Sequence, residues 1–285
     1  DGFGDDSSSS IHHIKSLQEI KNVWSSSFPN SVGLFFSAIT DFLGFSINEG
    51  EYKVMGLAAY GKPIFYNSLS KTIYFKDGKL FLDDDYYDFM RSVTKSYSNK
   101  LSSLFNIKER ESNTYLDIDS PNFKDYANIA ASAQKIVEEI LIEIFLFANK
   151  MTGENRFIFS GGVAMNSVAI NKLSKLNFIS KIIIPPSPGD SGAAIGAAYY
   201  SFLQNNKNYF QNPFKVNISN MLTPGLTSLT DHNEDFFLIN YERIANSEEI
   251  IDVASKLISE NEIIATCYKN IETGPRALGH RSMIC

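Results

Sequence analysis

The sequence predicts an α/β protein, because helical and strand patterns alternate over residues 122–204. Two short runs rich in isoleucine and phenylalanine have the length and composition of strands, and the segments around them have the spacing of helices. An alternation of this kind implies a sheet with helices packed on it. The expected order is a helix over 122–151, a strand over 157–160, a helix over 164–176, a strand over 181–184 and a helix over 191–204.

The helix over 122–151 is the clearest of these elements. Its apolar residues recur every three or four positions and form one wide stripe, which indicates a helix buried along one side. Gly153 follows where a helix commonly ends. The stripe consists of Ala127, Ala130, Ala131, Ile136, Val137, Ile140, Leu141, Ile144 and Phe145.

The segments before this helix are less regular. A high density of apolar residues predicts a mostly buried helix over 31–45 that ends at Gly44. Residues 49–63, EGEYKVMGLAAYGKP, mix charge, three glycines and a closing proline, which favours a short helix inside a functional loop. We expect a Ser-rich turn at 7–10 and, over 64–121, an insertion or small subdomain with KTIYF and KLFLDD as strands.

The composition changes after the last of these helices. A polar stretch rich in Asn, Gln and Pro runs over about 204–236, before a helix near 247–259 and a strand over 262–269. We therefore expect a first domain over 1–205, a linker over 206–236 and a second domain over 237–285. The ends, DGFGDD without a methionine and GHRSMIC without a polar tail, are those expected of a fragment of a longer polypeptide.

Charge and composition exclude several classes of function. The formal net charge is −6 and lysine and arginine are spread along the chain, so we expect no nucleic-acid partner. Cys267 and Cys285 are too few for a disulfide framework and lack metal-ligand spacing, which favours a reducing, cytoplasmic setting. No apolar run reaches the roughly 18 to 20 residues that span a bilayer, so we expect no membrane partner.

Two adjacent glycines stand where the strand over 157–160 passes into a helix, in FIFSGGVAMN. Without side chains, Gly161 and Gly162 leave backbone N–H groups open toward a ligand, which suits a phosphate or a nucleotide. Taken alone, such a pair more often marks a plain tight turn. The rest of the chain has to decide between the two readings.

Five segments combine glycine with polar residues: DGFGD (1–5), EYKVMGLAAYG (51–61), SGGVAMN (160–166), PPSPGDSGAAIGAA (185–198) and GPRALGHRS (274–282). Each is a weak motif by itself. In this order and spacing they resemble the NodU/CmcH-type O-carbamoyltransferases, whose sequences carry a DGxG turn, E-[FY]-K-V-M-G-L-A, SGGVAxN, PxxGDxGxAxGAA and GPRALGxRS. The resemblance covers nearly the whole chain.

The resemblance implies a nucleotide-binding fold of the actin, sugar-kinase and heat-shock-ATPase superfamily, here incomplete, followed by the start of a YrdC-like α/β domain. Enzymes of this family take carbamoyl phosphate and ATP, make a carbamoyl-adenylate and pass the carbamoyl group to a hydroxyl of a small-molecule acceptor such as a natural product or sugar. The sequence leaves open whether the protein forms a homodimer. The fragment alone is expected to be inactive.

The resemblance makes the glycine pair a wall of the nucleotide site. Gly161, Gly162 and Val163 would allow close approach of adenosine or phosphate, and Asn166 can offer both a donor and an acceptor. Gly189 and Gly192 would play a similar steric part in the next motif. The alternative for 160–166 remains a tight turn.

Asp1 and Asp190 match the family's metal ligands, together with two histidines expected shortly before residue 1. Hard carboxylate oxygens combined with imidazole suit a divalent ion, iron before magnesium. Alternatively, Asp1 is a frayed terminus and Asp190 caps the helix over 191–204. The resemblance also makes Asp190 a catalytic residue.

Glu51, Tyr52 and Lys53 match E-[FY]-K and are candidates for binding the substrate phosphate. A lysine there can neutralise a phosphate or polarise a carbamoyl oxygen as charge develops, so Lys53 is also a catalytic candidate. The alternative for Lys53 is a solvated loop lysine.

Arg276 and Arg281 lie in the GPRALGHRS loop, where a planar guanidinium suits bidentate contact with a phosphate or carboxyl-like group. Arg276 is a catalytic candidate, and His280 is expected to orient a phosphate. The alternative is a pair of arginines that satisfy buried carbonyls. His12 and His13 are adjacent, so their side chains point apart, and we expect both on the surface.

Two other functions stay open. A nucleotide-binding chaperone or regulatory ATPase of the same superfamily would not require the arginine-bearing GPRALGHRS segment. A tRNA threonylcarbamoyl transferase would call for a basic patch, which the sequence lacks. No Ser-His-Asp or Cys-His pattern suggests a covalent nucleophile, in keeping with transfer from an activated adenylate.

Overall fold

The computed structural model describes residues 2, 4, 6–92, 94–112, 114–206, 247–267, 274 and 281–285. By its internal contacts the chain divides into two compact units, Asp1–Ala197 and Ala198–Cys285. Except for residue 206, the predicted linker over 206–236 lies outside the described residues, so the predicted domain boundaries stay a prediction.

Helix α5 (Phe123–Thr152) runs through the first unit and confirms the long helix expected over 122–151. It ends at Gly153, which adopts φ +75° as a left-handed cap, a conformation that favours glycine. Its buried positions include most of the predicted apolar stripe. Because α5 contacts α1, α2, α3, α6 and β3, it is the element around which the first unit packs.

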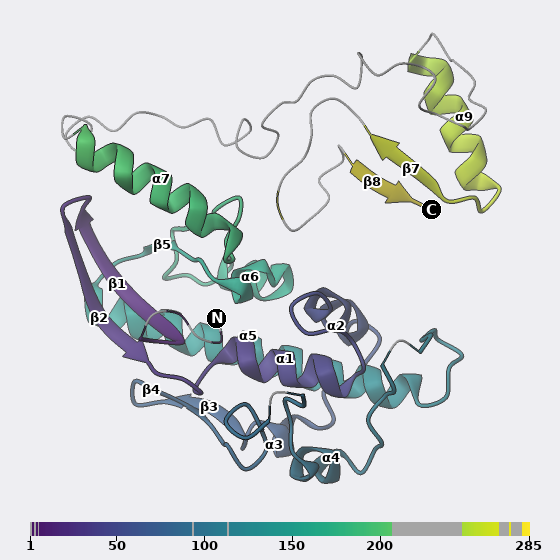
Figure 1. The fold of residues 1–285 in the computed structure, drawn as a ribbon, viewed down its shortest axis with the longest axis horizontal. Helices are drawn as coiled ribbons and strands as arrows, with labels where there is room; N and C mark the ends of the chain where they lie inside the picture. Colours follow the sequence, from purple (N-terminus) through teal and green to yellow (C-terminus); the bar gives the residue numbers. More distant parts are fainter. Residues whose placement is uncertain are drawn as a thin grey trace. The chain divides into compact units, whose positions relative to one another are not determined.

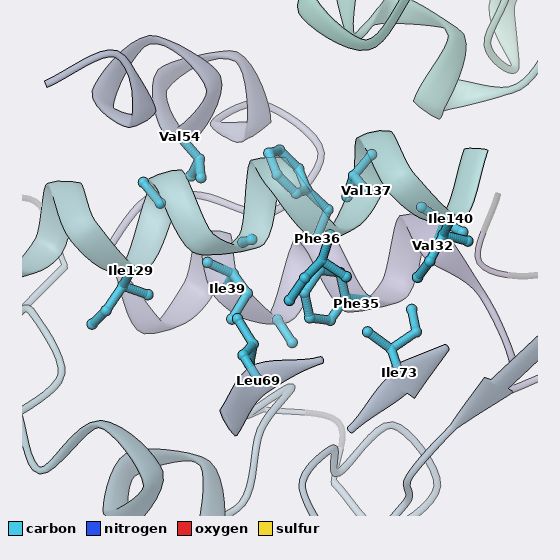
Figure 2. Close-up of a cluster of buried hydrophobic side chains, with 14 of the residues drawn as sticks. Val32, Phe35, Phe36, Ile39, Val54, Leu69, Ile73, Ile129, Val137 and Ile140 are labelled. Atoms are coloured by element: carbon cyan, nitrogen blue, oxygen red, sulfur yellow. The ribbon is translucent and has the colours of Figure 1, made fainter. Parts of the chain in front are cut away.

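Helices α1 (Val32–Phe42) and α2 (Glu51–Ala58) confirm the two helices expected before α5. Helix α1 begins at Ser31, whose hydroxyl accepts a hydrogen bond from the Leu34 amide at 3.1 Å. Phe35 and Ile39 of α1 belong to one buried cluster with Val137 of α5, and Val54 reaches the same cluster from α2 (Figure 2). The apolar density of 31–45 therefore reflects a helix that is mostly buried, as expected.

A second group of elements covers the other side of α1 and α5 (Figure 1). It contains α3 (Tyr66–Leu69), the antiparallel strands β3 (Ile73–Lys76) and β4 (Lys79–Leu82), and α4 (Asn99–Phe105). The β3–β4 turn, Asp77-Gly78, has positive φ at both residues, as in a type I′ hairpin turn. The two predicted strands are confirmed.

Strands β1 (Ser9–Ser16) and β2 (Glu19–Ser26) form an antiparallel hairpin that the sequence did not indicate. The predicted turn at 7–10 is wrong in part, because Ser9 and Ser10 already pair with β2. At the register shift between Ile11 and His12, Val23 of β2 has no partner in β1, and the adjacent Val23 and Trp24 are both half-buried, so the period of two that indicates a strand is interrupted in β2. His12 is exposed as predicted, whereas His13 is half-buried with Nε2 3.3 Å from Glu154 Oε1.

The predicted order helix, strand, helix, strand, helix is confirmed. After α5 come β5 (Arg156–Ile158), α6 (Ser167–Leu173), β6 (Lys181–Ile183) and α7 (Ser191–Asn205), and β5 pairs with β6 in parallel. The helix expected over 164–176 is split, because a 3₁₀ turn, η1 (Gly162–Met165), is followed by non-helical backbone at Asn166. The α/β class is therefore confirmed, with two strands in each sheet formed by the described residues.

The second unit contains α9 (Ser247–Ser259) and the antiparallel strands β7 (Ile264–Cys267) and β8 (Arg281–Ile284). Helix α9 and strand β7 confirm the helix near 247–259 and the strand over 262–269, and β8 was not expected. Across the described ranges, every helix is too short or too polar to cross a bilayer.

Candidate functional site

The two glycine motifs meet at one edge of the β5–β6 pair. SGGVAMN follows β5 and PPSPGDSG follows β6, and the carboxyl ends of neighbouring parallel strands lie side by side. The pairing continues past the strands, since the Phe159 amide donates to Ile183 O at 2.9 Å. Pro188 O then accepts from the Gly161 amide at 2.6 Å and from Ser160 Oγ at 2.9 Å. The structure therefore joins the two motifs directly.

Backbone geometry by itself accounts for two of the predicted glycines. Gly161 has φ +101° and ψ 164°, a combination that is essentially restricted to glycine. At Gly192 a Cβ would lie 2.0 Å from Ser187 O, so the fold of the 187–192 turn excludes a side chain. A Cβ at Gly189 would only touch Met165 Cε at 3.7 Å. Of the glycines at 189 and 192, Gly189 is thus the one that the described fold does not itself require.

Val163 and Asn166 both face the protein. Val163 packs against the main core. The Asn166 side chain caps α6, since its Oδ1 accepts from the Ala169 amide at 3.1 Å. The same amide group exchanges two hydrogen bonds with Gln134 of α5, at 2.9 and 3.1 Å. A nucleotide role for Asn166 stays a prediction, with one amide hydrogen left over from these bonds.

The Gln134 amide also bonds the buried carboxylate of Glu138, which pairs with the half-exposed Lys172. Gln134 Nε2 also donates to Glu138 Oε1 at 2.9 Å, one helical turn along α5. Glu138 Oε2 accepts from Lys172 Nζ, in the last turn of α6. The Glu138 side chain is 5% exposed and that of Lys172 is 54% exposed. The chain of contacts ties both ends of α6 to α5.

Glu51, at the start of α2, holds that helix in place. Its Oε1 accepts from Ser37 Oγ of α1 and from the Asn48 amide, each at 2.9 Å. Ser37 is buried, so the carboxylate links α2 to the core. Substrate binding by Glu51 stays a prediction.

Lys53 and Tyr52 are exposed on α2. The Lys53 ammonium lies 5.8 Å from the centroids of the Phe45 and Tyr52 rings, and it has no ion-pair partner among the residues that the structure describes. Met55 contacts α6 instead, since Ser167 Oγ lies 3.7 Å from its sulfur. Positions two apart on a helix point about 200° apart, so Lys53 points away from this contact. The structure therefore does not bring Lys53 onto the glycine turn.

Asp190 is exposed and directly precedes α7. Its backbone carbonyl accepts from the Ala193 amide at 3.0 Å, and within the described ranges its carboxylate has no hydrogen-bond or ion-pair partner. A carboxylate in this state fits a hard divalent cation. Asp1 lies outside the described residues. Among those described, the one group of three acidic or histidine side chains close enough to share a cation is Asp83, Asp84 and Asp85, on the loop after β4.

The predicted GPRALGHRS site is described only at its ends. Arg276 and His280 lie outside the described residues. Arg281 begins β8, opposite Cys267 of β7, and is exposed. Because it belongs to the second unit, its relation to the glycine motifs stays a prediction.

A comparison with protein families matches residues 1–199 to the family described as "Carbamoyltransferase N-terminus". The match covers well over half of the 285 residues. The chain belongs to this family. Within it, the region matched includes both glycine motifs, helix α2 and Asp190.

Curated relatives are longer than this chain. An uncharacterized protein of Synechocystis is 30% identical over 278 residues, which are 92% of this chain and 42% of the relative. An uncharacterized protein of Methanocaldococcus jannaschii is 27% identical over 284 residues, 99% and 51%. The nodulation protein NolNO of Sinorhizobium fredii is 28% identical over 287 residues, 99% and 38%. The chain thus spans about two fifths to one half of these relatives.

Sequence reasoning missed Gln134, Glu138 and Lys172. A signal was present, because Gln134 and Glu138 are one turn apart and continue the row of Ala127, Ala131 and Leu141 along the buried side of α5. A polar pair inside such a row indicates a partner that satisfies it. That partner proved to be the helix after the glycine turn in this carbamoyltransferase family member.

Proposed function

We propose that this chain is part of an O-carbamoyltransferase that uses carbamoyl phosphate and ATP and passes a carbamoyl group, by way of a carbamoyl-adenylate, to a hydroxyl of a small-molecule acceptor. The family match over 1–199 supports carbamoyl transfer. The five motifs support the ATP-dependent form of the reaction. In this proposal, the first unit belongs to an actin-like nucleotide-binding fold and the second begins a YrdC-like domain.

The proposed nucleotide site rests on one observation, namely that the two glycine motifs meet at the carboxyl ends of neighbouring parallel strands. Ligands of α/β proteins bind at that edge, where backbone amides and helix starts are accessible. At Gly189 the described fold would admit a side chain, since a Cβ there would only touch Met165 Cε at 3.7 Å. Close approach of a nucleotide would explain why this position is a glycine.

The transfer step needs cations and a base. When the acceptor oxygen attacks the carbamoyl carbon, the bond to AMP breaks and AMP leaves with negative charge, while the hydroxyl proton passes to a base. Lys53 and Arg276 are proposed to stabilise the developing charge. Tyr52, His280 and Arg281 are proposed to bind substrate phosphate, and Glu51 sets the start of the helix that carries Lys53.

The proposed metal ligands are Asp1 and Asp190, with iron preferred over magnesium. A bound divalent ion would supply a local positive charge able to lower the pKa of the acceptor hydroxyl. Asp190→Ala in the full-length protein should remove bound metal and carbamoyl transfer while sparing adenylate formation. Metal analysis of wild type and variant at matched concentration checks this. Equal metal contents would place the metal site elsewhere.

The function is tested by pyrophosphate release that depends on both ATP and carbamoyl phosphate. In the full-length protein, Gly162→Val should push a branched side chain toward the nucleotide and sharply weaken ATP binding. Ser132→Ala, in α5 and away from the glycine turn, is the control for a general loss of folding stability. ATP hydrolysis without any response to carbamoyl phosphate would favour a regulatory ATPase instead.

A further inference from the structure

We propose that Gln134 and Glu138 are positioning residues, which set the glycine turn at the distance and angle that its ligand requires. The inference rests on the proposed function, in which Gly161 and Gly162 line the nucleotide site. Neither residue belongs to a glycine motif. Both act through Asn166 and α6.

The first contact fixes the exit of the glycine turn. Asn166 follows η1 directly, and its amide is held by Gln134 in both directions, with each side chain donating once and accepting once. Gln134 and Asn166 are 5% and 9% exposed, so water does not replace these bonds easily. A shift of the turn would break both bonds together.

The second contact fixes the far end of α6. Glu138 Oε1 accepts from Gln134, and Glu138 Oε2 accepts from Lys172, six residues beyond Asn166. Two points of attachment define the direction of a helix, whereas one leaves it free to swing. Together Gln134 and Glu138 therefore determine where α6 points and where the turn before it lies.

Packing alone does not call for polar groups here. Apolar Ala127, Ala131 and Leu141 occupy the same row of α5 and are buried. A buried carboxylate and amide are costly to desolvate, and apolar residues of similar volume are often as stabilising. What hydrogen bonds add is a defined orientation, because apolar contacts are non-directional. A ligand site benefits from such support, since small displacements of binding groups weaken function strongly.

The test compares ATP affinity with folding stability in the full-length protein. Gln134→Met keeps the length of the side chain and removes its amide. We expect its ATP dissociation constant to rise at least about tenfold, the order that loss of a supporting contact costs at other sites. Ser132→Ala is the control, because it removes a buried hydroxyl of α5 that bonds Phe65 N and Asn128 O, away from the glycine turn. It should lower the unfolding midpoint and leave ATP affinity within about twofold of wild type.

Two further variants separate hydrogen bonding from folding. Glu138→Gln keeps one acceptor oxygen for Gln134 and loses the acceptor for Lys172, so it should weaken ATP binding about as much as loss of Lys172 does. Lys172→Met, at a half-exposed side chain, tests the second attachment if Gln134→Met does not fold, and should also weaken ATP binding.

The outcome identifies which proposal fails. If Gly162→Val weakens ATP binding and Gln134→Met does not, the positioning role is wrong and the nucleotide site stands. If neither variant changes ATP affinity, the glycine turn is not the nucleotide site and both proposals fall.

Discussion

Two glycines of one motif, Gly56 and Gly61, should respond to the same substitution with opposite signs. A Cβ at Gly61 would lie 1.9 Å from Ala127 O and 2.3 Å from Ala127 C of helix α5. Ordinary contact begins at 3.4 Å, so the loop would have to retreat by about 1.5 Å. A Cβ at Gly56 would meet nothing within 4 Å.

If the loop that carries Gly61 moved away from α5, it would lose its hydrogen bonds to that helix. The Lys62 amide donates to Asn128 Oδ1 at 2.8 Å, and the Phe65 amide donates to Ser132 Oγ at 3.1 Å. Loss of two hydrogen bonds at about 1 kcal/mol each, with about 1 to 3 kcal/mol of overpacking, gives an expected loss of about 3 to 5 kcal/mol for Gly61→Ala. Gly56→Ala should instead add about 0.5 to 1 kcal/mol, because alanine restricts the unfolded chain and favours helix.

Urea unfolding followed by tryptophan fluorescence measures both effects. Trp24 is the single tryptophan, and it reports on the first unit because its Nε1 donates to Gly78 O at 2.6 Å and its ring packs on Phe75. A loss below about 1 kcal/mol for Gly61→Ala would refute the close approach of the loop to α5. Loss of stability in Gly56→Ala would show that its surroundings are not open.

Two further predictions concern charge. Arg110 is buried, which lowers the pKa of its guanidinium. The guanidinium donates hydrogen bonds to Leu43 O at 2.5 Å, Gly44 O at 2.9 Å and Thr114 O at 2.6 Å. A lysine cannot make this set of bonds, so Arg110→Lys should lower the free energy of unfolding in urea by about 2 to 4 kcal/mol. Glu143 is exposed, but partial desolvation and the neighbouring Glu139 carboxylate raise its pKa, so the folded chain binds this proton more tightly than the unfolded chain and the ionised form at neutral pH is mildly destabilising. Glu143→Gln should therefore raise the unfolding midpoint at neutral pH, and the gain should vanish in acid below about pH 4.3; a gain that persists there would contradict the assignment.

The elements with strong local patterns followed from the sequence. The spacing of apolar residues determined α5, α1 and α9, and the short β-branched runs determined β5 and β6, because helix and strand periods are properties of neighbouring residues. The hairpin β1–β2 did not follow. The extra residue Val23 in β2 breaks the period of two, and the pairing of the strands is decided by contacts across the turn.

The glycine motifs and their family could also be recognised from the sequence, because SGGVAMN and PPSPGDSG are short contiguous segments whose residue types and spacing can be read directly. Only the tertiary structure decided how the motifs are held. Pro188 meets Gly161 27 residues away, and Gln134 meets Asn166 32 residues away. Such contacts depend on how strands and helices pack, so the sequence pattern left Gln134 as an unexplained polar residue on a buried face. The fold made it the partner of the glycine turn.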